Sequence, residues 1–290
     1  MNKLSLHCQA MPGWTGSWLS QSGARWIKLI DPPEQRPQDF PAGVNIVGRT
    51  YLPDGESTEM VRKGKQGALE WFTTWLPFYK SRPYIQVWES TNEPVPPWDI
   101  HLMQRLRYFT AELSTLMAGE GLKLVGFNLS VGWPYLLTFD DPAPRARLLG
   151  PAVQVLHDNG HYIGLHEYSA PTMQTAQGAY CLRYRNTVRE WREAGYQVPR
   201  IFIGECGIDG GVVGRPKTGW KTFATEAEYA DQLRWYDAEI TKDDDVEAAF
   251  VFTAGPNQDW MDFEATESLA IALTQPTHQK QNSLKARRRT

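Results

Sequence analysis

Short apolar runs rich in β-branched and aromatic residues recur along the chain, separated by longer amphipathic stretches. Near-continuous apolar runs of this length are typical of parallel strands that are buried on both faces. Helical periodicity fills the intervals over 65–80, 99–121, 182–195 and 226–240, whereas the early intervals contain only short helices, such as the segment after Trp14. The predicted strands are LSLHC (4–8), RWIKLI (25–30), GVNIVG (43–48), YIQVWE (84–89), LVGFNLS (124–130), YIGLHEYS (162–169), RIFIGE (200–205) and AAFVFTA (248–254).

This alternation, which runs without a linker or a break in composition, predicts an α/β protein with a single closed (β/α)8 barrel over residues 1–276. No GxGxxG motif follows the first predicted strand, which counts against an open dinucleotide-binding sheet. Residues 277–290 are basic and have no apolar period, so we expect a disordered tail there. In barrels of this kind the active site lies at the carboxyl ends of the strands.

Composition narrows the classes of partner. Of the 290 residues, 41% are hydrophobic and 22% are charged, and the formal net charge is -3. This balance is typical of a soluble globular protein and offers no general attraction for nucleic acid or membranes, whereas oligomeric state is not readable from it. Cys8, Cys181 and Cys206 lie far apart without a CxxC pair, so we expect free buried thiols.

The first ten residues, MNKLSLHCQA, lack the apolar core of a signal peptide. That pattern leaves three locations open: the cytoplasm, release by lysis, or secretion as a mature form whose leader was removed. The sequence does not choose among them.

Polar and charged side chains gather at the carboxyl ends of the predicted strands. Glu93 follows the fourth strand and Glu205 ends the seventh, and these two strands lie nearly opposite each other in an eight-stranded ring. Two carboxyl groups across one mouth suit glycoside hydrolysis, because one protonates the leaving oxygen while the other attacks or assists at the anomeric carbon. The other polar residues at these ends are Lys28, Asp31, Arg49, Asn92, Asn128, Ser130, His166, Tyr168 and Thr253.

Three motifs at these strand ends resemble those of one group of enzymes. WESTNEP (88–94) looks like the fourth-strand signature of clan-A glycoside hydrolases, the "4/7" barrels that include cellulases, mannanases and xylanases. IFIGECG (201–207) resembles their seventh-strand signature, and HEYSAP (166–171) resembles their sixth-strand His-x-Tyr. The motifs fall on the expected strands in the expected order, and the barrel pattern extends over nearly the whole chain.

The resemblance implies a retaining mechanism, with Glu93 as general acid/base and Glu205 as nucleophile. It also implies that Asn92 hydrogen-bonds the sugar 2-hydroxyl, that Tyr168 donates to Glu205, and that His166 binds substrate or steadies Glu93. Once Glu205 is charged, that charge and partial burial both disfavour ionisation of Glu93, so we expect Glu93 to be protonated and to act as the acid. No cofactor is implied.

Other side chains are expected to support the site. Arg49 and Asn128 are predicted to bind substrate, although loop capping is as good an interpretation for Asn128. Glu89 is predicted to point into the barrel and to pair with Arg49 or Lys28, because a buried charge needs a partner. Several tryptophans fall in loops after strands, where an indole can cover the apolar face of a sugar ring, and we expect two or three to line subsites, Trp133 and Trp260 first. They are Trp14, Trp98, Trp133, Trp220 and Trp260.

Two residues common in clan-A enzymes are missing. At the end of the eighth strand, FVFTAGPNQDW offers Phe252 or Trp260 in place of the usual Trp. The second strand offers Lys28 in place of an Arg, while Arg49 sits on the third strand, and Lys is not an equivalent fork donor. These departures put the identity of the substrate in doubt more than the mechanism, because both carboxylate motifs are intact.

Three expectations concern residues around the site. The long Gly-rich loop over 207–223 suits a mobile lid over the cleft. Strand alternation turns Glu167 toward the surrounding helices or solvent. His157 and His161 flank a helix-to-strand turn at the opposite face and are predicted to be surface residues.

We therefore expect a retaining endo-type β-glycoside hydrolase that acts on a β-linked polysaccharide or oligosaccharide and needs no cofactor or metal. The main alternative is a glycan-binding barrel without hydrolytic activity, or a transglycosidase, on the same scaffold. A metal-dependent barrel hydrolase is a third possibility, but the first strand carries HCQ where an HxH pair would be needed. The sugar and its linkage are not predicted.

Overall fold

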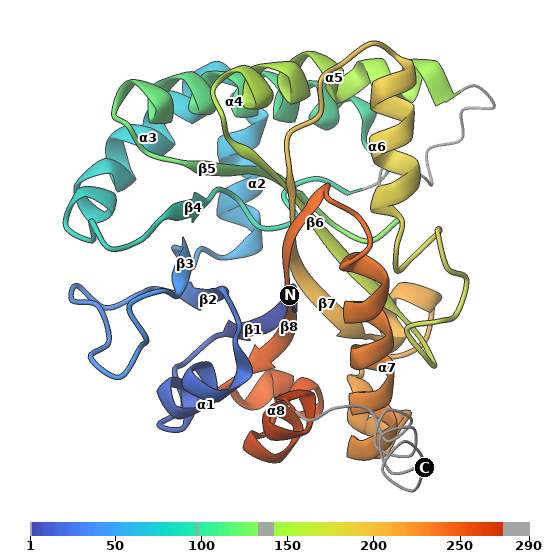
Figure 1. Cartoon of the computed structure of the whole chain (residues 1–290). Coiled ribbons are helices and arrows are strands. Elements are labelled where there is room, and N and C mark those ends of the chain that lie inside the picture. Colours follow the sequence, from blue (N-terminus) through green and yellow to red (C-terminus); the bar gives the residue numbers. More distant parts are fainter. Residues whose placement is uncertain (1, 97, 133–141, 275–290) are drawn as a thin grey trace, which may run out of the picture.

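The strands form a closed parallel barrel. The computed structural model describes residues 2–96, 98–132 and 142–274, and within them eight strands pair in chain order, with β8 returning to β1 (Figure 1). This arrangement confirms the predicted (β/α)8 fold, while the predicted tail at 277–290 lies outside the described residues. The strands are β1 (Leu4–Cys8), β2 (Trp26–Ile30), β3 (Asn45–Arg49), β4 (Val87–Glu89), β5 (Leu124–Leu129), β6 (Tyr162–Ser169), β7 (Ile201–Ile208) and β8 (Val246–Ala254).

Helices surround the barrel, and two of them, α3 and α7, coincide with their predicted ranges (Figure 1). The α-helices are α1 (Thr15–Ser22), α2 (Asp54–Arg62), α3 (Lys65–Lys80), α4 (Ile100–Gly119), α5 (Pro142–Asp158), α6 (Tyr184–Glu193), α7 (Glu226–Ile240) and α8 (Glu267–Thr274). Three short 3-10 helices lie in the loops after β7 and β8, namely η1 (Gly210–Val213), η2 (Trp220–Thr222) and η3 (Gln258–Phe263).

Local side chains set the starts of two long helices. At α7, the Thr225 side chain accepts from the backbone N–H of Glu228, and the Glu228 carboxylate accepts in return from the backbone N–H of Thr225. At α4, the Asp99 carboxylate accepts from the backbone N–H of Leu102 at 2.8 Å. Each cap satisfies backbone donors that have no partner inside the helix.

The barrel interior changes from apolar to charged along the strands. Side chains on a strand alternate in direction, so residues two apart point the same way. Lys28, Arg49 and Glu89 each lie two positions after an apolar interior residue, and the interior therefore becomes charged toward the carboxyl ends. The apolar interior cluster consists of Trp26, Val47, Val87, Val125, Phe202, Ala248 and Phe250.

A larger apolar layer lies between the strands and the helices. Trp88 of β4 stacks on Tyr79 of α3, with ring centroids 4.5 Å apart. The indole N–H of Trp18 in α1 donates to the backbone oxygen of Ala270 in α8 at 2.8 Å, which joins the first and last helices of the ring. This layer fixes the helices against the barrel, so that the loops at the carboxyl ends start from rigid elements.

The pairing register shifts where the candidate site residues lie. Between β6 and β7 it shifts between Leu165 and His166, so that His166 pairs with Glu205. Between β1 and β8 it shifts between His7 and Cys8. An extra residue in one strand of a pair bends that strand and redirects its side chains. The shifts therefore help to aim these side chains toward the barrel mouth.

The predicted states of Cys8, Cys181 and Cys206 are confirmed, since all three are free and buried. Glu167 faces the helices, as alternation predicts, where it accepts from the hydroxyl of Tyr236 at 2.6 Å; burial raises the pKa of Glu167. None of the helices in the described part of the chain combines the length and hydropathy that a membrane span needs.

The prediction that His161 lies at the surface is wrong, whereas His157 is partly exposed as expected. The His161 ring is 2% exposed, and its Nε2 lies 2.9 Å from the backbone oxygen of Ser114 in α4. The turn that carries His161 packs against α4. A sequence pattern does not show which helix a turn will contact. Burial lowers the pKa of His161.

Candidate active site

Glu93 stands at the barrel mouth, in the loop that follows β4. Its φ of 40° lies in the left-handed region, which costs a residue other than glycine about 1–3 kcal/mol. The backbone N–H of Glu93 donates to the backbone oxygen of Asn128 at 3.1 Å, and the Asn128 side chain donates to the backbone oxygen of Thr91 at 2.9 Å. These bonds join the loop to the end of β5 and hold Glu93 in its strained conformation.

Glu205 lies on β7 and is 7% exposed. The Tyr168 hydroxyl donates to Glu205 Oε2 at 2.8 Å, and Arg49 Nη1 donates to Glu205 Oε1 at 3.2 Å. Burial acts to raise the pKa of Glu205, but the charges of His166, Lys28 and Arg49 outweigh it and hold this pKa well below its ordinary value. Glu205 is therefore ionised at neutral pH, as a nucleophile must be.

His166 of β6 brings the two carboxyl groups together. Its Nδ1 lies 2.8 Å from Glu93 Oε1 and 3.6 Å from Glu205 Oε2. Because both oxygens are within reach of one nitrogen, they lie at most about 6.4 Å apart, the sum of those two distances. The two predicted catalytic carboxylates thus meet over one pit rather than in separate cavities.

A layer of buried charge lies beneath Glu205. Lys28 Nζ is 2.7 Å from Glu89 Oε2, and neither side chain is exposed, so the predicted pairing of Glu89 with Lys28 is confirmed. Arg49 Nη1 lies 4.0 Å from the same oxygen and also donates to Asn92 Oδ1 at 2.5 Å. Arg49 therefore bridges Glu205, Glu89 and Asn92, which places on β3 the guanidinium that β2 lacks.

Sequence reasoning missed His7, the penultimate residue of β1, which lies beneath Glu205. His7 Nδ1 lies 3.0 Å from the hydroxyl of Thr253 on β8, and His7 Nε2 lies 3.7 Å from Glu205 Oε1. The His7 ring is fully buried, and burial together with the Lys28 charge lowers its pKa well below the ordinary value. The available signal is the position of this histidine near the carboxyl end of a predicted strand, where the HCQ segment lacks the second histidine of a metal-binding pair.

A cavity of about 300 Å³ opens over the two carboxylates. Asp209, which follows β7, is a second residue that sequence reasoning missed; its carboxylate accepts from the backbone N–H of Gly211 at 2.7 Å. Burial and the neighbouring Glu93 and Glu205 raise the pKa of Asp209. The cavity is lined by Glu93, Ser130, Val131, Tyr168, Tyr180, Glu205, Asp209, Val212, Lys217, Trp260 and Phe263.

Aromatic side chains form one wall of the cavity. Trp260 is partly buried and meets Phe252 edge-on, with ring centroids 5.0 Å apart, and Phe263 completes the cluster. Lys217 Nζ lies 3.7 Å from the centre of the Trp260 ring, a cation–π distance. Of the two residues predicted to replace the strand-eight Trp, Trp260 lines the cavity and Phe252 packs behind it.

The remaining predicted tryptophans differ in position. Trp220 is buried and stacks on Tyr229, so it packs the loop rather than facing the cleft. Trp14 packs against the apolar layer, whereas Trp98 is 79% exposed. Trp133 lies outside the described residues.

Two further predictions concern the pit wall and its loops. The Asn128 side chain is fully buried under the loop after β4, so it does not reach the cavity. The predicted lid contains η1 and η2, and Asp209 bridges to Gly219 across it. Of the residues in that loop, Asp209, Val212 and Lys217 line the cavity.

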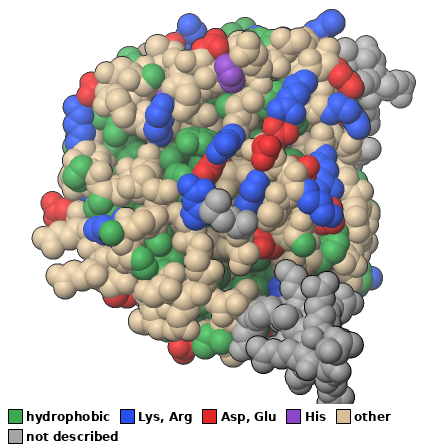
Figure 2. Space-filling model, in the orientation of Figure 1, with side chains coloured by type: hydrophobic (Ala, Val, Ile, Leu, Met, Phe, Trp, Pro, Cys, Tyr) green, Lys and Arg blue, Asp and Glu red, His purple; other side chains and the backbone are tan. Residues whose placement is uncertain are grey.

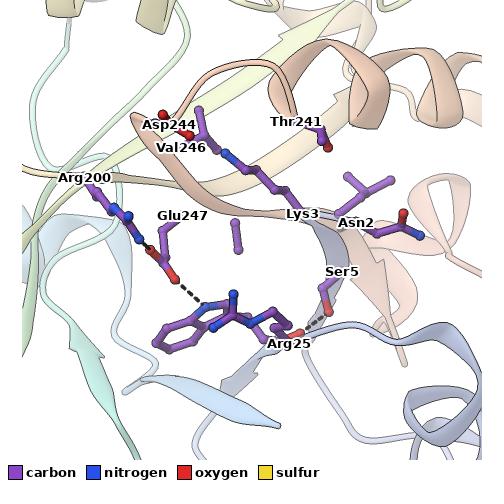
Figure 3. Close-up of a pocket in the computed structure, with 12 residues that line it drawn as sticks. Asn2, Lys3, Ser5, Arg25, Arg200, Thr241, Asp244, Val246 and Glu247 are labelled. Atoms are coloured by element: carbon purple, nitrogen blue, oxygen red, sulfur yellow. Dashed lines mark hydrogen bonds and ion pairs between the residues drawn. The ribbon is translucent and has the colours of Figure 1, made fainter. Parts of the chain in front are cut away.

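A second cavity, of about 310 Å³, lies at the opposite ends of the strands (Figure 3). Arg200 pairs with Glu247 at 2.6 Å, Glu247 accepts from the Trp26 indole at 2.9 Å, and Lys3 Nζ donates to the backbone oxygen of Asp243. In the orientation of Figure 1, Lys and Arg side chains likewise lie beside Asp and Glu over the molecular surface (Figure 2). None of the predicted catalytic residues lines this cavity, and the amino ends of barrel strands ordinarily serve stability.

Within the described ranges, no group of three or more His, Cys, Asp and Glu side chains is arranged to hold a metal ion. No known family model matches the sequence, and no curated protein does.

Solved structures do match over nearly the whole chain. A GH128 (subgroup I) endo-β-1,3-glucanase from Amycolatopsis mediterranei, in complex with laminarihexaose, has a TM-score of 0.57 at 15% identity, with 94% of this chain and 99% of that chain covered. A GH5 xyloglucan-specific endo-β-1,4-glucanase from a metagenomic library has a TM-score of 0.57 at 12% identity, with coverages of 91% and 88%. The chain has the barrel fold of these glycoside hydrolases. Subunit Z of the cellulose synthase of Clostridioides difficile shares it too, with a TM-score of 0.55 at 12% identity and coverages of 95% and 100%.

Proposed function

We propose that the protein is a retaining β-glycoside hydrolase of the endo type that acts on a β-linked glucan. The observation that carries the proposal is the meeting of Glu93 and Glu205 at one imidazole nitrogen. Retaining enzymes hold their two carboxyl groups about 5–5.5 Å apart, whereas inverting enzymes need about 6.5–9.5 Å to admit a water molecule. An upper limit of about 6.4 Å between one oxygen of each group, Glu93 Oε1 and Glu205 Oε2, favours the retaining case.

In the first step, the ionised Glu205 carboxylate attacks the anomeric carbon while Glu93 gives its proton to the leaving glycosidic oxygen. The Tyr168 and Arg49 donors hold Glu205 in one orientation. Asn92, whose Oδ1 accepts from Arg49, is the residue proposed to bind the sugar 2-hydroxyl. In the second step, Glu93 takes a proton from water, which attacks the glycosyl ester and releases Glu205.

The proposed substrate class rests on the cavity and on the structural neighbours. An aromatic wall at Trp260 beside polar groups at the pit floor suits a pyranose, which has an apolar face and a polar rim. The neighbours named above include endo-acting enzymes on β-1,3-glucan and on xyloglucan, so these two polymers come first among candidates.

The direct test is incubation of the protein with a panel of β-1,3-glucan, β-1,4-glucan, xyloglucan, mannan and xylan, followed by sizing of the products. We expect release of mixed oligosaccharides from at least one polymer and none from the Glu205→Gln control. If a polymer slows the migration of the protein in an affinity gel but no oligosaccharides are released, the protein is a binding barrel and the proposal fails.

A second pair of variants separates the two carboxylates. Glu93→Gln should hydrolyse a glycoside with a good leaving group far better than a natural substrate, because the first step then needs no acid. Glu205→Gln should be inactive on both substrates. Equal losses on both substrates for Glu93→Gln would remove Glu93 from the role of acid.

A further inference from the structure

The imidazole of His166 has two nitrogens with different surroundings. Nδ1 faces Glu93 Oε1 at 2.8 Å, near the solvent side of the pit. Nε2 is buried deeper and has no hydrogen-bond partner among the described residues. Glu89 Oε1 is likewise buried without such a partner in the described part of the chain. The same interior holds His7 Nε2, which also lacks such a partner within the described ranges, and Glu89 Oε2, which is ion-paired with Lys28 at 2.7 Å. A buried nitrogen and a buried carboxylate oxygen without hydrogen bonds are costly unless an attraction between them offsets part of that cost.

Gly204 of β7 shows that these two atoms face the same small region. A Cβ atom on Gly204 would stand 2.6 Å from Glu89 Oε1 and 3.2 Å from His166 Nε2. The Lys28 ammonium fixes this arrangement, because it pairs with Glu89 Oε2 and donates to the backbone oxygen of Gly204 at 2.9 Å. With Oε2 held by Lys28, Oε1 is the oxygen on the Gly204 side. It lies within about 5.8 Å of His166 Nε2, the sum of the two distances from that Cβ position, and beyond the 4.0 Å of a direct ion pair.

We propose that Glu89 is a positioning residue that keeps a proton on His166 Nε2 and, through the ring, keeps the catalytic proton at Glu93. This inference rests on the function proposed above. A bare lone pair at Nε2 would face an anionic oxygen in a buried site, which is repulsive, whereas an N–H there is attracted to it. With Nε2 protonated, a neutral ring has only a lone pair at Nδ1, so the short contact to Glu93 needs a proton between the two atoms.

That proton has two positions that differ by a small displacement. In one, Glu93 is a carboxylic acid that donates to Nδ1; in the other, His166 is an imidazolium that donates to the Glu93 carboxylate. Both forms contain the same number of protons and differ only in which atom holds the shared one. In the first step the proton leaves Glu93 for the glycosidic oxygen, and in the second step a proton from water replaces it. The Nε2 proton stays in place throughout.

Charge balance around the ring supports one shared proton. When the sugar bonds to Glu205, that carboxylate becomes neutral as Glu93 becomes anionic, so the summed charge of the two is unchanged. The Arg183 side chain adds a fixed cation, since its guanidinium donates to the backbone oxygen of His166 at 2.8 Å. Several titratable and charged groups face the ring or its immediate partners. They are Glu93 and Glu89 from β4 and its loop, Glu205 from β7, Asp209 after β7, Tyr168 from β6, His7 from β1, Lys28 from β2, Arg49 from β3, and Arg183 before α6.

The experiment is nitrogen NMR on the full chain with ¹⁵N-labelled histidine, with the His166 signals assigned from a His166→Asn variant. We expect a protonated Nε2 in the wild-type protein across the range of pH in which the enzyme is active. A bare Nε2 with the proton on Nδ1 would overturn the proposal. This measurement needs no substrate, so its outcome is independent of whether the protein hydrolyses a glycoside.

The variant Glu89→Gln tests the consequence for catalysis. A neutral amide at this position removes the negative charge that attracts the Nε2 proton, so the basic limb of the kcat/KM profile should move to lower pH, by about one unit. The decrease in kcat/KM of this variant should be larger on natural substrates than on substrates with a good leaving group. If this variant does not fold, the nitrogen NMR measurement on the wild-type protein still decides whether Nε2 carries the proton.

Glu167→Gln is the matched control, because it removes a buried carboxylate from the same strand as His166 but on the helix side of the barrel. It should reduce stability without changing the His166 nitrogen signals or the basic limb. A basic limb that stays in place in Glu89→Gln, or that moves equally in Glu167→Gln, would show that Glu89 acts only on stability.

Discussion

The hydrogen bond from Tyr168 to Glu205 allows a quantitative test of the proposed nucleophile. Tyr168→Phe removes one donor, at 2.8 Å from Oε2, and leaves the Arg49 contact to Oε1 intact. A hydrogen bond to a charged group contributes about 1.5–3 kcal/mol, and one pKa unit corresponds to about 1.4 kcal/mol. The pKa of Glu205 should therefore rise by about one to two units in Tyr168→Phe.

The assay is kcat/KM as a function of pH on the acidic side, where loss of activity reports protonation of the nucleophile in the free enzyme. In the wild-type protein the low pKa of Glu205 should keep the acid limb well below the ordinary pKa of a glutamate. In Tyr168→Phe this limb should move to higher pH by about one to two units. The loss of activity at neutral pH should be smaller than the loss on the acidic side.

Tyr236→Phe is the matched control, because its hydroxyl also donates to a buried glutamate, Glu167, outside the barrel interior. It should cost stability but leave the acid limb where it is. An acid limb that does not move in Tyr168→Phe, or that moves as far in Tyr236→Phe, would refute the assignment of that limb to Glu205.

The remaining predictions concern stability, pH and the aromatic wall. Lys28→Met leaves Glu89 buried without its nearest cation and should lower the free energy of unfolding by about 3–5 kcal/mol in denaturant titrations. Adding Glu89→Leu should restore stability, and a Lys28→Met protein as stable as the wild type would contradict this prediction. Because the pKa of Glu205 is lowered in the folded state, ionised Glu205 stabilises the fold above the ordinary carboxyl pKa, and this contribution is lost as pH falls through its folded-state pKa. The wild type should therefore lose more stability on acidification than Glu205→Gln. Trp260→Ala should raise KM for polymer about tenfold with a smaller change in kcat, and an unchanged KM would remove Trp260 from the binding surface.

The strands and most helices were predictable because burial on both faces leaves a strong apolar signal in each strand. The ends of the strands were less predictable. β4 begins at Val87 rather than at Tyr84, and β7 continues to Ile208 beyond the predicted end at Glu205. Ladder pairing with neighbouring strands decides such ends, and a single run of sequence does not contain it.

The site divides in the same way. Motifs predicted Glu93, Glu205, His166 and Tyr168 at the strand ends, and the structure brings these four side chains together. The motifs did not predict that His7 would lie beneath Glu205, next to the register shift between β1 and β8. Nor did they identify Asp209, which reaches the cavity through the turn that its own side chain forms with Gly211.

The roles of the two carboxylates are tested most directly by trapping the covalent intermediate. A 2-deoxy-2-fluoro-β-glucoside with a good leaving group, extended to the chain length that the enzyme accepts, should inactivate the protein with one sugar bound per chain. Peptide mass spectrometry should then find that sugar on Glu205, in an ester that forms more slowly in Tyr168→Phe. A label on Glu93 or on Asp209, or turnover that gives a product of inverted anomeric configuration, would contradict the account.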